Sequence, residues 1–253
     1  MRWKAAVRGL ALLGLSACVG DTEAPKENRS APLSASEAEW FVSLGGGGRS
    51  GRFWQPDYRP SSGRPGIYEV TRYPYAPTTP EQSRAADDLL RRSLTVAEER
   101  GWFDYERGLA DGFHNMRELD RLHFANDAHL RDGRMLDPER PEFLMYYDTS
   151  GGKKLAGFMY LADTQYGSGP QIGGPLTVWH YHIWDRPMCW SAGVPLASAT
   201  GTCVEGVPAD RSPEMIHVWF IEHPEGSFAT TMGLTRDLID QLAEDRYIQP
   251  EDL

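Results

Sequence analysis

Basic segments are scarce in this chain. Its 253 residues include 26 Lys and Arg against 36 Asp and Glu, which gives a formal net charge of −10. Without a Lys/Arg-rich tract, the chain lacks the positive surface that binds phosphate backbones. We therefore expect no nucleic acid partner, and we expect the protein surface to adhere poorly to anionic lipids.

Several motifs of known chemistry are absent. The sequence has no GxxxxGKS/T phosphate loop, no CxxCH haem-attachment site and no internal repeat. It also lacks a Gly-x-Ser-x-Gly elbow, so a serine hydrolase of that kind has no visible nucleophile. Acidic residues are abundant, but no spacing singles out a catalytic pair of carboxylates. Motifs alone leave open whether the protein is an enzyme.

Long hydrophobic runs are missing as well. The apolar stretch near the N-terminus centres on residues 10–13, far short of the roughly 20 residues that a membrane-spanning helix needs. It follows the basic residues Arg2, Lys4 and Arg8. This arrangement is typical of a cleaved targeting segment.

The end of that segment, Leu15-Ser16-Ala17-Cys18, resembles the lipobox of bacterial lipoproteins. The resemblance implies a signal peptide over residues 1–17 and acylation of Cys18, palmitate included. The acyl chains would anchor the protein to a membrane of the bacterial cell envelope, on the periplasmic or the exterior side. The alternative is an ordinary secretory signal with an incidental cysteine.

Cysteine is scarce, with three residues in all. If Cys18 is lipidated, Cys189 and Cys203 are left as a pair in an oxidising compartment. We expect these two to form a disulfide. A thiolate metal site is the alternative, although the pair contains no CxxC spacing.

Composition divides the mature chain into two parts. Residues 18–65 are largely Ser, Pro, Ala, Glu and Gly, which predicts a flexible tether behind the lipid. Residues 66–253 predict a single globular domain, with a first short strand near residues 66–70. A hydrophobic content of 40% and eight tryptophans are enough to bury a core.

Periodicity predicts helices first and strands later. Thr79, Pro80 and Gln82 form a helix start, apolar residues then recur at helical spacing, and Gly101 ends the run. Further predicted elements are a helical region over residues 105–130 that is broken around Asp111-Gly112, a hairpin of 143–147 with 155–161, strands at 176–184 and 215–221, and a helix at 235–246. This order indicates an α+β fold with a mainly antiparallel sheet or a small barrel.

The segment around His180 and His182 is the sharpest chemical feature. Alternate residues of a strand share a face, so these two imidazoles would point the same way and could occupy adjacent positions on a metal ion. If the 215–221 strand pairs with this one, His217 becomes a third nitrogen ligand, and His123 is a candidate from the region predicted to be helical. Glu142 and Glu222 are weaker oxygen-ligand candidates.

Each histidine also has a structural interpretation as a hydrogen-bonded core residue. Five aromatic residues near these strands could line an apolar or sugar-binding pocket, or could simply be core: Trp179, Tyr181, Trp184, Trp190 and Trp219.

Two resemblances go with these motifs. The segments 123–126, 136–142 and 173–182, with Cys189, Cys203, the His217-Val218-Trp219 element and residues 224–229, are similar to a group of uncharacterised secreted bacterial lipoproteins that carry WHxH and HVW elements. A fainter resemblance to cupins implies a metal held inside a small β-barrel. The chain departs from cupins because no glutamate follows His182 at the short spacing that they use.

Three hypotheses follow. The first is a lipid-anchored extracytoplasmic protein that binds zinc, copper, iron or nickel through His180, His182 and His217, with His123 as a further member. The second is a non-enzymatic lipoprotein that holds a small-molecule ligand among aromatic side chains. The third is a structural envelope protein.

Overall fold

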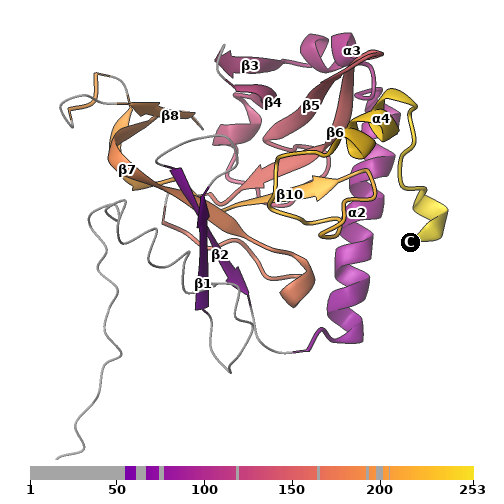
Figure 1. Ribbon diagram of the computed structural model, residues 1–253, viewed down its shortest axis with the longest axis horizontal. Coiled ribbons are helices and arrows are strands. Elements are labelled where there is room, and N and C mark those ends of the chain that lie inside the picture. The colour runs from indigo at the N-terminus through magenta and orange to yellow at the C-terminus, as the bar shows by residue number, and fades with distance from the viewer. Residues whose placement is uncertain are drawn as a thin grey trace, which may run out of the picture. The chain divides into compact units, whose positions relative to one another are not determined.

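The strands of the protein form one twisted sheet, flanked by a long helix and a short one (Figure 1). The computed structural model describes residues 55–60, 67–73, 77–117, 120–163, 166–191, 194–197, 202–204 and 206–253. The lipobox with Cys18, the signal peptide over 1–17 and the tether up to residue 54 lie outside these residues. Within them, no helix combines the length and the apolar character needed to cross a membrane.

Ten strands make up the sheet, and all pairings among the described residues are antiparallel. The strands are β1 Gln55–Pro60, β2 Ile67–Tyr73, β3 Phe113–Arg117, β4 Asp120–Asn126, β5 Phe143–Thr149, β6 Gly152–Leu161, β7 His180–Ser191, β8 Val194–Ala197, β9 Val207–Arg211 and β10 Met215–Trp219. Their order is β1-β2-β7-β10-β6-β5-β4-β3, and β8 and β9 also pair with β7. The fold is therefore α+β with an antiparallel sheet, as the sequence predicts.

The helices are α2 Pro80–Arg100, α3 Tyr105–Ala110 and α4 Arg236–Ala243, with short 3-10 turns η1 His129–Arg131, η2 Gly174–Leu176 and η3 Pro250–Asp252. The predicted capping of α2 is confirmed. The Gln82 amide donates to Thr79 Oγ1 at 3.2 Å, and the Thr79 amide donates to Gln82 Oε1 at 2.9 Å. Gly101 ends the helix in the left-handed conformation, with φ 72°.

Both faces of the sheet are covered. Apolar residues of α2, including Leu90 and Leu94, pack with Phe158 and Val218 of the strands in one core. A second core on the opposite face contains Met159 and Trp219 from the strands together with α4 residues. Alternation along each strand sends neighbouring side chains into different cores.

Close approach of strands β6 and β10 requires a residue without a side chain at position 157. A Cβ atom on Gly157 would lie 2.0 Å from the carbonyl oxygen of Val218. Such a contact cannot form, so any larger residue would push these strands apart.

Three sequence predictions need correction at element boundaries. In the helical region predicted over residues 105–130, the predicted break around Asp111-Gly112 is present, but the helix predicted beyond it is wrong. Gly112, with φ +93°, turns the chain into the β3–β4 hairpin. Phe113 and Phe124 of that hairpin are 1% exposed and enter the core beside α2, so tertiary packing decides the strand conformation. The strand predicted from residue 176 begins at His180, and the strand predicted up to residue 221 ends at Trp219.

Other predictions are confirmed. Strands β5 and β6 form the expected hairpin, and α4 begins after its N-cap Thr235. Cys189 and Cys203 form a disulfide with a Cα–Cα distance of 5.6 Å. The prediction for residues 18–65 differs from the structure in one part, because residues 55–60 of the predicted tether form β1, which pairs with β2 along its whole length.

Candidate metal centre

Strands β2 and β7 bring three potential metal ligands onto one face of the sheet. In the antiparallel register, Glu69 lies opposite His182 and Thr71 lies opposite His180. Directly opposed residues in an antiparallel pair project from the same face. His180 and His182 share a face because they are two residues apart on one strand. Glu69 projects from that same face.

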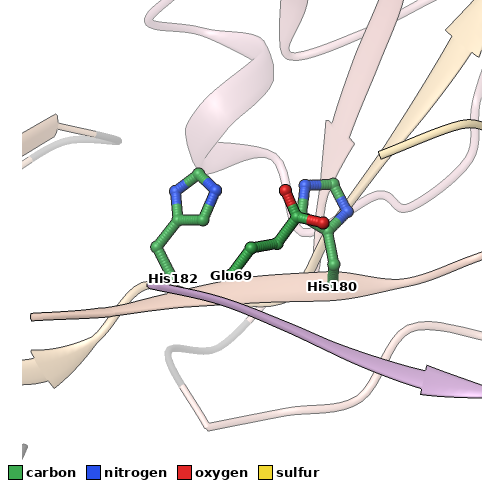
Figure 2. A group of neighbouring side chains, drawn as sticks. All are labelled: Glu69, His180 and His182. Carbon is green, nitrogen blue, oxygen red and sulfur yellow. The ribbon is translucent and has the colours of Figure 1, made fainter. Parts of the chain in front are cut away.

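The three side chains converge. One ligand atom from each of Glu69, His180 and His182 lies within 4.8 Å of the other two. Figure 2 shows the two imidazoles standing on β7 and the Glu69 carboxyl group reaching up from β2 between them. Glu69 is 5% exposed and His180 is 1% exposed, whereas His182 is only partly buried. The cluster thus extends from the interior toward the surface at His182.

A second layer of polar contacts holds the cluster in place. The Thr230 hydroxyl, itself buried, donates to Glu69 Oε1 at 2.5 Å. On β7, the His182 amide donates to Ser212 Oγ at 2.9 Å, and the Ser212 amide donates to the His182 carbonyl at 2.8 Å. A hydrogen bond to the ligand side chain, such as that from Thr230 to Glu69, orients the ligand and raises metal affinity in known metal sites. The Ser212 contacts fix the backbone of His182.

His217 lies next to His180. The expected pairing of β7 and β10 is present through Met215 and His180, and the His180 and His217 ring centroids are 4.8 Å apart. His217 Nδ1 lies 3.2 Å from the carbonyl oxygen of Ala229, which can only accept, so this nitrogen carries the proton. Burial, and then the neighbouring imidazoles of His180 and His123, hold the pKa of His217 well below its usual value. His217 is therefore neutral at neutral pH, with a lone pair on Nε2.

His123 reaches the same face from β4. Strands β5 and β6 separate β4 from β10, so in a flat sheet the two histidines would be about 14 Å apart. Their ring centroids are 6.3 Å apart and the rings are stacked, which shows how strongly the sheet curls. His182, His180, His217 and His123 thus form a row, although His217 and His123 are not among the three residues whose ligand atoms converge.

The weaker glutamate candidates lie elsewhere. Glu222 is exposed in the turn after β10. Glu142 is 4% exposed, and burial is the main cause that raises its pKa to about 8. Neither belongs to the converging group among the described residues.

Glu69 is not among the ligands predicted from the sequence. A signal was present, because the predicted strand at residues 66–70 contains one acidic residue among apolar ones. A buried glutamate in a strand needs a polar partner.

The aromatic residues near the site are mainly core. Trp179, Trp184 and Trp219 are at most 1% exposed and pack within the molecule. Tyr181 is 8% exposed, and its ring lies 4.4 Å from the Arg211 guanidinium carbon.

Two imidazoles and one carboxylate are a donor set that suits zinc and iron(II). Catalytic zinc sites use two histidines and a glutamate with an open position, and non-haem iron(II) enzymes use two histidines and one carboxylate. Three protein ligands leave room for water or a substrate atom. Comparison of the chain with protein-family models, curated proteins and solved structures found no match.

Proposed function

We propose that this protein is a lipid-anchored metal-binding protein of the bacterial cell envelope. Its ion would be held by Glu69, His180 and His182. The single observation that carries the proposal is the convergence of one ligand atom from each of these residues within 4.8 Å.

The burial of the cluster supports a cation there. Placing a carboxylate and two imidazoles in a low-dielectric interior is costly unless charges are compensated. A divalent cation compensates the carboxylate and uses the imidazole lone pairs at the same time. When bound, such an ion would act as a Lewis acid toward a substrate oxygen or would activate water.

The chain's own residues would prepare the site. Thr230 holds one Glu69 oxygen, and His217 packs its neutral ring edge-on to His180. Partial exposure of His182 provides the route by which an ion and a substrate enter.

The proposed location rests on the lipobox resemblance at Cys18. The disulfide between Cys189 and Cys203 supports it, because disulfides persist outside the reducing cytoplasm. Acyl chains on Cys18 would supply the membrane attachment, and nucleic acid is not proposed as a partner.

Metal content of the full chain tests the proposal. The protein, carrying no polyhistidine tag, is equilibrated with zinc, iron(II), copper or nickel, desalted and measured by inductively coupled plasma mass spectrometry. We expect one ion per chain, and we expect it to be lost in Glu69→Gln, His180→Ala and His182→Ala. His114→Ala is the matched control, since His114 is exposed on β3.

Two results would overturn the proposal: no metal bound from any of the four salts, or triad variants that retain as much metal as His114→Ala. Circular dichroism of each variant separates lost ligands from lost folding. His217→Ala and His123→Ala then test the remaining predicted ligands. A loss equal to that of His180→Ala makes either residue a ligand, and a partial loss makes it a positioning residue.

A further inference from the structure

A cavity of about 600 Å³ shares a wall with the metal centre. It lies between α2, the η2 turn and the segment Pro224–Thr230. Small-molecule sites in proteins commonly have volumes of roughly 300–1,000 Å³. The cavity is therefore large enough for an organic ligand.

About half of the cavity wall is apolar. Leu90 of α2, Val178 and Phe228 contribute to it, and so does Leu176 of η2. Leu176 is 41% exposed, which is unusual for a large apolar side chain in this molecule. A ligand with an apolar body would cover this surface and gain hydrophobic stabilisation.

The charged residues of the wall are all acidic. Asp87 and Glu225 line the cavity, and no Lys or Arg is among its described lining residues. The Thr231 hydroxyl donates to Glu225 Oε2 at 2.8 Å and fixes one side of that carboxylate. Carboxylates attract a cationic group and repel an anionic one. Asp87 is partly buried and Glu225 is exposed, so solvent screens the attraction more at Glu225 than at Asp87.

The wall segment Pro224–Thr230 also holds the metal centre. Thr230 lines the cavity and donates its hydroxyl to Glu69. Its neighbour Ala229 lines the cavity and accepts hydrogen bonds from His217 Nδ1 and Trp219 Nε1. A ligand that fixes this segment therefore also fixes two contacts of the histidine and glutamate cluster.

We propose that this cavity binds a small molecule with an apolar body and a protonated amine, and that its occupancy is coupled to the metal centre through Thr230. The coupling rests on the proposed metal-binding function, whereas amine binding does not. Because coupling between two sites is reciprocal, a bound amine strengthens metal binding as much as the metal strengthens amine binding.

Three probes of equal chain length test the ligand class: hexylamine, hexanol and hexanoate. Each is titrated calorimetrically into the full chain after treatment with a chelator. We expect hexylamine to bind about tenfold more tightly than hexanol, the effect of one charge-assisted contact, and hexanoate to bind most weakly. Asp87→Asn and Glu225→Gln should each reduce the preference for hexylamine over hexanol.

Asp88→Asn is the matched control for the cavity. Asp88 follows Asp87 on α2, but it pairs with Arg91 at 2.6 Å and does not line the cavity. Hexanoate binding as tightly as hexylamine, no binding of any probe, or an Asp87→Asn effect no larger than that of Asp88→Asn would each overturn the amine site.

Coupling is measured as the ratio of zinc affinities with and without saturating hexylamine. We expect a rise of about fivefold, at the low end of typical allosteric coupling. Thr230→Val should abolish the rise, and Thr230→Ser, which keeps the hydroxyl, should restore it. An unchanged zinc affinity on amine addition contradicts the coupling.

Failure of the two proposals can be told apart. If the chain binds hexylamine selectively but binds no metal, the amine site stands, and the metal-binding function and the coupling fall together. If it binds metal but shows no preference for the amine, the metal centre stands and the cavity proposal falls.

Discussion

Glu69 and Glu142 are two almost equally buried glutamates with opposite surroundings. They are 5% and 4% exposed, respectively. Glu69 accepts a hydrogen bond from Thr230, and one of its carboxyl oxygens lies within 4.8 Å of a nitrogen of each of two imidazoles. Glu142 Oε2 has no hydrogen-bond partner among the described residues.

The difference lies in what each carboxyl group can bind. Burial, with smaller contributions from Asp132 and Asp137, raises the pKa of Glu142 to about 8. Glu142 is therefore mainly protonated at neutral pH and is a poor metal ligand. The Thr230 hydroxyl holds one Glu69 oxygen, and a carboxyl oxygen lies within 4.8 Å of the donor nitrogens of His180 and His182. Neighbours, rather than burial alone, distinguish a candidate ligand from a buried acid.

The largest expected effect separates the two glutamates by metal affinity. Glu69→Gln removes the charged donor of the triad, so zinc affinity should fall by about 1,000-fold, beyond the roughly 10–100-fold of an outer-shell change. Glu142→Gln should leave it unchanged. Competition with a chromogenic chelator measures both variants. Equal losses of zinc affinity in Glu69→Gln and Glu142→Gln would show that the two glutamates do not differ as metal ligands.

The second expected effect is a change in the free energy of unfolding with pH. The folded state keeps the Glu142 proton up to pH about 8, whereas in the unfolded chain the carboxyl loses it near 4.5. Between these values the unfolded state binds fewer protons, so the free energy of unfolding decreases as pH rises. The contribution is on the order of 5 kcal/mol across the window.

Urea unfolding at several pH values checks this slope. Glu142→Gln cannot titrate, so its stability should decline less between pH 4.5 and about 8 than that of the unmodified chain. Parallel pH curves for the two proteins would contradict the raised pKa of Glu142.

A smaller effect is expected at Thr230. Thr230→Val removes the hydroxyl that holds Glu69 but keeps the side-chain shape, so zinc affinity should fall by about 10–100-fold. Thr231→Val is the control, because its hydroxyl donates to Glu225 instead. If chelator competition gives the same zinc affinity for Thr230→Val and Thr231→Val, Thr230 does not contribute to metal binding.

The smallest expected effect is a loss of stability on substitution of Tyr160, which lies near Glu142. Tyr160, whose pKa is raised by burial and by the nearby Glu142, shares a hydrogen bond of 3.1 Å with Ser93 Oγ of α2. Tyr160→Phe should reduce stability by about 1 kcal/mol, the usual cost of one buried hydrogen bond. Metal content should not change. A loss of metal in Tyr160→Phe would show that the surroundings of Glu142 also affect metal binding at Glu69.

Local signals predicted α2 closely. Its capping box, its first-turn proline and its terminal Gly101 act within a few residues, so neighbouring residues alone decide where the helix begins and ends. The β5–β6 hairpin is similarly local. The region after Ala110 was mispredicted because Phe113 and Phe124 become strand residues by packing into a core built largely from distant parts of the chain.

The sequence by itself determined that His180 and His182 share a face, because side chains in a strand alternate with a period of two. It also indicated the Cys189–Cys203 pair. Only the tertiary structure decided which carboxylate joins the histidines. Glu69 belongs to a strand far earlier in the chain, and its position opposite His182 depends on the register of β2 against β7. A shift of that register by one residue would turn Glu69 to the other face, and no local pattern in either strand specifies which residues meet.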